Sequence, residues 1–236
     1  MTSGTRVGLL DSGVAPELAA HLVGARCFAL DRQSDQTVPD PVGHGTTLAR
    51  IILAQAPGTG LLNAQIFGHA NVVEAAVAAA GLDWLVAERA CLVNMSLGLA
   101  EDRQILAQSC AAARRAGVVL LAASPARGGA VYPAAYPGVI RITGDARCAP
   151  GEISALGTAQ ADFGACVTQS MDAAGPKAGG ASFAVAHACG VLARQFGDGA
   201  RITAEAARRY LDSIARYRGP ERRNTATSST AADHRN

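Results

Sequence analysis

Short, largely apolar segments recur along the chain, and segments whose apolar residues have helical spacing separate them. Clear examples are Arg6–Leu10, Cys91–Met95 and Val118–Ala123. A strand that is apolar throughout must be covered on both faces, which is typical of a parallel sheet. The intervening helical segments can supply that cover. The pattern therefore predicts an α/β fold with a mostly parallel sheet and helices on both faces.

The core must be built from small aliphatic side chains, because 49% of the 236 residues are hydrophobic but only 4% are aromatic. Such side chains favour closely packed helices and buried strands. Gly117 is a suitable helix stop and Asn71 a suitable helix cap. The remaining predicted elements are strands over Ala25–Leu30, Gly60–Phe67 and Gly138–Thr143, a helical turn over Pro16–Leu22, and helices over His44–Gln55, Asn71–Glu88, Asp102–Ala116, Ser182–Phe196 and Thr203–Tyr217.

The chain is long enough for one sizeable core and short for two domains. We therefore predict a single domain over residues 1–218, large enough to be a catalytic domain. From Gly219 to Asn236 the sequence is polar and lacks periodicity, which predicts a disordered tail. The arginines of the last helix and tail are interpreted as a solvated face, with docking of a partner as the alternative.

Composition excludes several classes of function. A net charge of +2 gives no reason to expect a nucleic-acid partner. The six cysteines show no C-x-x-C spacing, so they are predicted to be small buried hydrophobes and not zinc ligands. No segment has the length of a membrane span or the pattern of a secretory signal, which predicts a cytoplasmic protein. Phosphate-loop and dinucleotide motifs are absent from the sequence, and no carboxylate cluster suggests calcium; we predict no cofactor and no metal.

Three short motifs contain the residues of a hydrolytic site. They are V-G-L-L-D-S-G with Asp11, G-H-G-T with His44, and G-A-S-F-A with Ser182. Sites in open α/β sheets lie outside the carboxyl ends of the strands, where the three can converge. A serine hydroxyl needs an imidazole to take its proton, and a carboxylate must orient that imidazole. Backbone N–H groups at a helix start can stabilise the oxyanion. The motifs predict a catalytic triad.

Each of these residues also has a structural interpretation. Asp11 could cap the turn that follows it, His44 could merely begin a helix, and Ser182 could be an ordinary helix cap. His187 competes as the base, but its apolar helix indicates a core histidine. The order and spacing of the three motifs together favour the catalytic interpretation.

With these motifs the chain resembles the subtilase family, whose members have the order Asp, His, Ser. The segment L-V-N-M-S-L-G is similar to the family strand that pairs with an extended substrate, which implies that Ser96, Leu97 and Gly98 bind substrate. A second resemblance concerns the sequence G-V-V-L-L-A-A-S-P, followed by Y-P-A-A-Y-P-G-V-I. It is similar to the family segment that runs from the oxyanion strand to the far wall of the specificity pocket. This resemblance implies that Ala123 and Ser124 also bind substrate. The resemblance covers roughly residues 5–197 and implies a three-layer subtilisin-like fold, serine endopeptidase activity and a peptide or protein substrate.

The chain departs from the family pattern near the expected oxyanion site. Ala123-Ser124-Pro125 stands where the family usually has Ala-Gly-Asn, and proline cannot donate. Loss of that donor costs about 10²–10³ in kcat, a magnitude known from subtilisin itself. We hypothesise that Ser124 or another donor replaces it in part. Ala181 and Ala186 replace the usual Thr and Pro, and no inhibitory propeptide precedes Val7. These changes favour a slow, selective enzyme.

Such an enzyme resembles the small processing subtilases that cut leader peptides from post-translationally modified peptides. The resemblance implies a radical-SAM peptide-modifying enzyme as the partner that holds the substrate, with no role for nucleic acid or a membrane. Two alternatives stay open at this stage. One is a general intracellular peptidase, and the other is a degenerate subtilase that binds peptides without cutting them.

Overall fold

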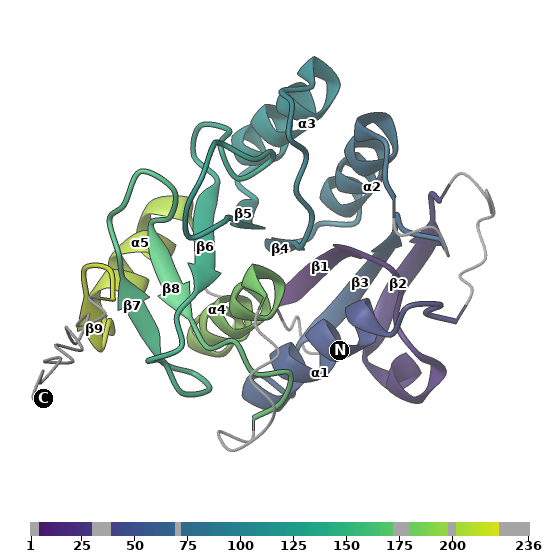
Figure 1. The fold of residues 1–236 in the computed structure, drawn as a ribbon. Helices are drawn as coiled ribbons and strands as arrows, with labels where there is room; N and C mark the ends of the chain where they lie inside the picture. Colours follow the sequence, from purple (N-terminus) through teal and green to yellow (C-terminus); the bar gives the residue numbers. More distant parts are fainter. Residues whose placement is uncertain (1–4, 30–38, 69–71, 172–179, 198–201, 222–236) are drawn as a thin grey trace, which may run out of the picture.

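The computed structural model describes residues 5–29, 39–68, 72–171, 180–197 and 202–221. Their strands form one nine-stranded sheet in the order β2-β3-β1-β4-β5-β6-β8-β7-β9 (Figure 1). The strands are β1 (Arg6–Asp11), β2 (Leu22–Cys27), β3 (Gly60–Gln65), β4 (Leu92–Met95), β5 (Val119–Ala123), β6 (Ile140–Gly144), β7 (Ile153–Ala155), β8 (Phe163–Ala165) and β9 (Tyr217–Arg218). The helices are the 3-10 helix η1 (Pro16–His21), α1 (His44–Gln55), α2 (Ala75–Ala87), α3 (Gln104–Arg115), α4 (Ala181–Gln195) and α5 (Ala204–Ser213).

The sheet is parallel except where β7 runs antiparallel to β8. The first strand, β1, lies between β3 and β4, so that Leu9 is in register with Asn63 on one side and Asn94 on the other. The chain adds β2 and β3 to one side of β1 and β4, β5 and β6 to the other. The direction of winding therefore reverses at β1, and in open α/β sheets such a reversal leaves a crevice at the carboxyl ends of the strands.

Helices cover both faces of the sheet, as the sequence pattern predicted. Buried residues of α1, α4 and α5 pack on one face together with Leu9 of β1. Buried residues of α2 and α3 pack on the other face together with Leu10. Adjacent residues of one strand thus enter opposite cores, because strand side chains alternate between faces. Figure 1 shows α1 and α4 on the same side of the sheet.

Several predicted boundaries are confirmed and others are wrong. The helix over His44–Gln55 has the predicted bounds. The second strand occupies Leu22–Cys27, three residues earlier than predicted, because its pairing with β3 begins at Leu22. Helix α2 begins at Ala75 after Glu74, and the predicted cap Asn71 lies outside the described residues. The predicted helix over Thr203–Tyr217 ends at Ser213, and its last predicted residue belongs to β9. We did not predict β7, β8 and β9, whose two or three residues are too few for a periodicity.

All six cysteines are free, and five are buried as predicted. Cys91 is exposed, so the prediction was wrong there; it lies just before β4, where its N–H bonds the Arg6 carbonyl. In the described ranges no helix is both long and apolar enough to cross a membrane. Most of the predicted tail, from residue 222 onward, lies outside the described residues.

Candidate active site

Asp11 ends β1 at the crevice and is fully buried. Its Oδ1 accepts hydrogen bonds from the Ser12 backbone N–H at 2.8 Å and the Ser12 hydroxyl at 3.1 Å, and the same oxygen lies 2.8 Å from His44 Nδ1. A carboxylate can only accept, so Nδ1 carries the proton of the neutral ring and Nε2 keeps a free lone pair. The Asp11–His44 pair therefore has the orientation that a general base requires.

His44 is the first residue of α1, and glycines on both sides bring it close to the turn after β1. Gly43 precedes the helix with a φ of 78°, in the left-handed region that glycine tolerates. A Cβ on Gly45 would lie 2.2 Å from the Gly13 carbonyl oxygen and 3.1 Å from Asp11 Oδ1. Only glycine allows this approach, which sets the His44 ring against Asp11.

The environment of His44 favours its protonated form. Burial of the ring opposes protonation, but the hydrogen bond and charge of Asp11, with a smaller contribution from the Asp40 charge, outweigh it and raise the pKa of His44 above its ordinary value of 6.5. A general base must be neutral to accept a proton. Activity that depends on His44 should consequently fall as the pH drops through this raised pKa.

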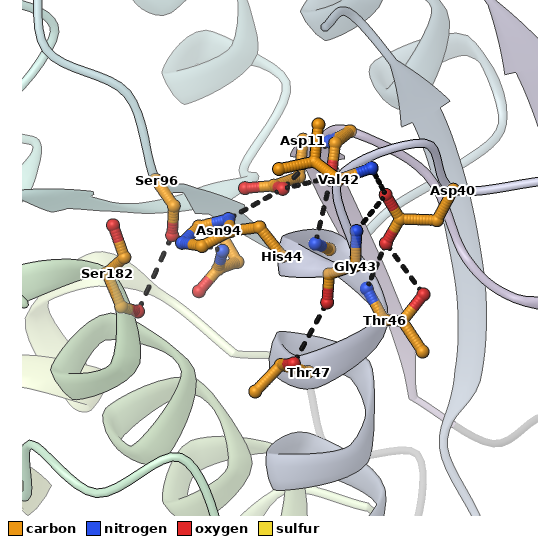
Figure 2. Close-up of polar contacts among 12 residues, drawn as sticks. Asp11, Asp40, Val42, Gly43, His44, Thr46, Thr47, Asn94, Ser96 and Ser182 are labelled. Atoms are coloured by element: carbon orange, nitrogen blue, oxygen red, sulfur yellow. Dashed lines mark hydrogen bonds and ion pairs between the residues drawn. The ribbon is translucent and has the colours of Figure 1, made fainter. Parts of the chain in front are cut away.

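Ser182 lies in the first turn of α4, across the crevice from Asp11. The Ser96 hydroxyl donates to the Ser182 carbonyl at 3.5 Å and accepts from the Asn94 amide at 2.9 Å. The ring of the next residue, Phe183, lies 5.7 Å from the His44 ring, centroid to centroid. Figure 2 shows the imidazole between the Asp11 carboxylate and Ser182.

His44 and Ser182 line the same cavity, whose volume is about 440 Å³. Three of the predicted substrate-binding residues, Ser96, Leu97 and Gly98, also line it. The other two, Ala123 and Ser124, are not among its lining residues in the described part of the chain. The full lining is Val42, His44, Phe67, Val72, Val73, Ser96, Leu97, Gly98, Leu99 and Ser182.

The hypothesis that Ser124 donates to an oxyanion is not supported by its contacts. The residue is 4% exposed, and its hydroxyl donates to the Gln160 carbonyl at 2.6 Å. Its backbone N–H donates to the Ile142 carbonyl at 2.8 Å, which extends the pairing of β5 with β6. Both donors of Ser124 are therefore occupied, and the side chain joins two loops.

His187, the competing base, is fully buried on α4, and its Nε2 lies 3.1 Å from the Thr168 carbonyl oxygen. Burial, opposed by that hydrogen bond, lowers the pKa of His187 below its ordinary value. A neutral imidazole sealed in the core cannot reach substrate, so the interpretation as a core histidine is confirmed.

Within the described ranges, no three His, Cys, Asp or Glu side chains are grouped as metal ligands.

Several residues at the site were missed by sequence reasoning. Val42 and Phe183 were passed over because single apolar residues carry no periodic signal. Thr46 was quoted only as part of the histidine motif. Asp40 was overlooked although it precedes His44 by four residues, the spacing at which a carboxylate can reach the N–H groups of a helix start.

Comparison with known proteins agrees with this geometry. The profile of the subtilase family (peptidase S8) matches residues 2–229. The chain belongs to the subtilase family. This is a family of subtilisin-like serine endopeptidases, and its order of Asp, His and Ser is the one that this subtilase carries at positions 11, 44 and 182.

Two curated subtilases illustrate the likeness in sequence. A thermostable alkaline protease of Halalkalibacterium halodurans is 29% identical over 151 residues, which cover 59% of this chain and 41% of that protein. The minor extracellular protease Epr of Bacillus subtilis is 32% identical over 150 residues, 58% of this chain and 23% of that protein. The chain thus spans less than half the length of these relatives.

Two solved structures illustrate the likeness in fold. A cold-adapted subtilisin-like serine proteinase superposes with a TM-score of 0.72 at 23% identity, covering 89% of this chain and 81% of that one. A lanthipeptide protease superposes with a TM-score of 0.69 at 16% identity, covering 89% and 79%. The predicted subtilisin-like α/β fold is confirmed.

Proposed function

We propose that this subtilase is a serine endopeptidase in which Asp11, His44 and Ser182 form the catalytic triad. The observation that carries the proposal is the shared cavity: His44, oriented by the buried Asp11 carboxylate, lines it together with Ser182. A base with a free Nε2 and a hydroxyl at a helix start are the two groups that acyl transfer needs on one side of a substrate.

The reaction follows from these positions. Ser182 Oγ attacks the peptide carbonyl carbon while His44 Nε2 takes the hydroxyl proton. The tetrahedral oxyanion is stabilised by N–H groups at the start of α4, including that of Ser182. His44 then passes the proton to the leaving amine, the C–N bond breaks, and an acyl-enzyme ester remains. Water then attacks the ester carbonyl carbon while His44 Nε2 accepts a proton from it. The ester C–O bond breaks, Ser182 Oγ takes that proton back, and the new carboxylic acid is released.

The cavity lining supports an extended substrate with apolar side chains. Val42 and Val72 are 43% and 76% exposed, and both belong to the lining. Leu99 exchanges two backbone hydrogen bonds with Tyr132. In the described part of the chain, the backbone groups of Leu97 and Gly98, which lie outside the helices and strands, make no such bond. A peptide can pair with those free groups as an added strand.

We propose further that the physiological reaction is removal of a leader peptide from a cross-linked peptide in the cytoplasm. The specific candidate is the small subunit of quinohemoprotein amine dehydrogenase, presented by the radical-SAM enzyme that installs its cross-links. The support is the sequence resemblance to small processing subtilases and the fold shared with a lanthipeptide protease. Pro125 in place of an oxyanion donor favours a slow enzyme whose partner supplies selectivity.

Labelling with a fluorophosphonate probe tests the peptidase chemistry. We expect covalent labelling of the wild-type protein and none of Ser182→Ala, with Ser170→Ala as a matched control that still labels. If the wild-type protein does not label although it is folded, the chain is a binding module and the triad assignment is wrong.

Mass spectrometry of a modified precursor tests the substrate. The precursor is incubated with wild type or Ser182→Ala, alone and with the radical-SAM enzyme. We expect a single cleavage at the leader junction, only with wild type, and little degradation of casein. Rapid casein degradation would instead identify a general peptidase. An intact precursor in the presence of a probe-reactive protein would rule out the leader-peptide role.

A further inference from the structure

The Asp40 carboxylate caps the helix that begins with His44. Gly43, the residue in the capping position, has no side chain to do this. Asp40 Oδ1 accepts from the backbone N–H groups of Val42 at 3.1 Å and Gly43 at 2.8 Å. Asp40 Oδ2 accepts from the Thr46 backbone N–H at 2.9 Å and from the Thr46 hydroxyl at 2.7 Å. One carboxylate thus binds the residues on both sides of His44 (Figure 2).

The same network reaches the turn that follows Asp11. Thr46 Oγ1 accepts from the Ala15 backbone N–H at 3.0 Å, so Thr46 links Asp40 to this turn. Gly13, in the same turn, packs so closely that a Cβ on it would lie 3.1 Å from Asp40 Cα. The Ser12 hydroxyl accepts from the Gly45 N–H at 3.0 Å. The two turns that carry Asp11 and His44 are therefore connected through Asp40 and Thr46.

The negative charge of Asp40 is maintained by these contacts. Burial opposes ionisation, but hydrogen bonds from Thr46, Ser12 and Gly43 outweigh it and hold the pKa of the Asp40 carboxyl below its ordinary value. The charged groups that act on the His44 ring from the described chain are Asp11 of β1 and Asp40 of the turn before α1. The residue of α4 whose ring contacts the His44 ring is Phe183, which carries no charge.

We propose that Asp40 is a positioning residue of the active site, one that fixes the start of α1 relative to the Asp11 turn and adds a second negative charge near the catalytic imidazole. The inference rests on the proposed peptidase function for its effect on turnover. Asp40 does not line the cavity in the described chain, so it acts through His44 and not on the substrate.

The substitution Asp40→Asn separates this role from a merely structural one. An amide keeps one acceptor but turns an N–H group toward the Thr46 N–H and removes the charge. We expect a roughly tenfold lower kcat with little change in KM, because misplacement of a catalytic group lowers turnover more than binding. We also expect the NMR titration midpoint of His44, measured in a Ser182→Ala background, to shift to lower pH.

Two further variants complete the test. Asp212→Asn removes an exposed carboxylate that pairs with Arg218, and it should change neither kcat nor the His44 midpoint. Thr46→Val removes only the hydroxyl link, so it should lower kcat without shifting the midpoint, and Thr46→Ser should restore kcat. The Thr46→Val variant also tests the hydroxyl link between Asp40 and the Asp11 turn if Asp40→Asn fails to fold.

An unchanged His44 midpoint and unchanged kcat in folded Asp40→Asn would overturn the inference, as would full activity of Thr46→Val. The NMR titration needs no catalysis. It therefore still tests Asp40 if the fluorophosphonate experiment shows that the peptidase proposal is wrong.

Discussion

The histidine side and the serine side of the cavity are held in different ways. On the histidine side, Asp11, Asp40, Ser12 and Thr46 take part in a set of hydrogen bonds within and between two turns, each 2.7–3.1 Å long. On the serine side, the Ser96 hydroxyl donates to the Ser182 carbonyl across a longer distance of 3.5 Å. There the position comes from α4, of which residues 184–193 are all buried.

The position of the base therefore depends mainly on hydrogen bonds, whereas the position of the nucleophile depends mainly on packing. Hydrogen bonds are directional and change with protonation, so the histidine side should respond to polar substitutions and to pH. Packing is non-directional and set by volume, so the serine side should respond to changes in the core.

The largest effect is expected for Asp11→Asn on the histidine side. The amide would donate to His44 Nδ1 and hold the ring in the wrong tautomer. We expect kcat to fall by about 10⁴-fold, the size measured for such changes in other serine proteases, subtilisin among them. Steady-state kinetics on a peptide substrate measures it, with thermal unfolding as the control for folding. A loss smaller than tenfold would mean that His44 is not the base oriented by Asp11.

A smaller, different effect is expected for Leu192→Ala on the serine side. Leu192 is fully buried in the core between α4 and the sheet. Its truncation should lower the free energy of unfolding by about 2–5 kcal/mol. Below the melting temperature the pH dependence of kcat should keep its wild-type midpoint, because no polar contact of His44 changes. Urea unfolding and a pH–rate profile measure both, and a shifted midpoint would show that the two sides are not independent.

The same contrast explains how much could be predicted from the sequence. The strands around β1 and the helix over His44–Gln55 were predictable because their patterns are local: apolar runs, helical spacing and glycines at the ends. The triad motifs were found because their order and spacing are specific. The antiparallel pair β7 and β8 was missed because each strand has only three residues, too few to show an alternation of apolar and polar side chains.

Polar contacts between distant segments were the least predictable part of the site. Thr46 meets Ala15 in the turn after Asp11, 31 residues away in the sequence, only after β1 and α1 have packed together. The hydrogen bond of the Ser124 hydroxyl could not be predicted for the same reason. Its partner Gln160 is 36 residues away, and no local pattern connects the two.

The smallest effect is expected for Ser124→Ala, because Ser124 belongs to neither the histidine side nor the serine side of the cavity. The substitution leaves the partly buried Gln160 carbonyl without its donor, and this should lower the free energy of unfolding by about 1 kcal/mol. Turnover should stay within about twofold of wild type, because the Ser124 hydroxyl bonds another loop and not the cavity. Removal of a true oxyanion donor would instead lower kcat by about 10²-fold or more. Chemical unfolding and single-turnover acylation kinetics measure the two quantities, with Thr158→Ala, in the same loop as Gln160, as the control. A hundredfold slower acylation with unchanged stability would instead restore Ser124 as the oxyanion donor, and the Gln160 bond would then have to break when substrate binds.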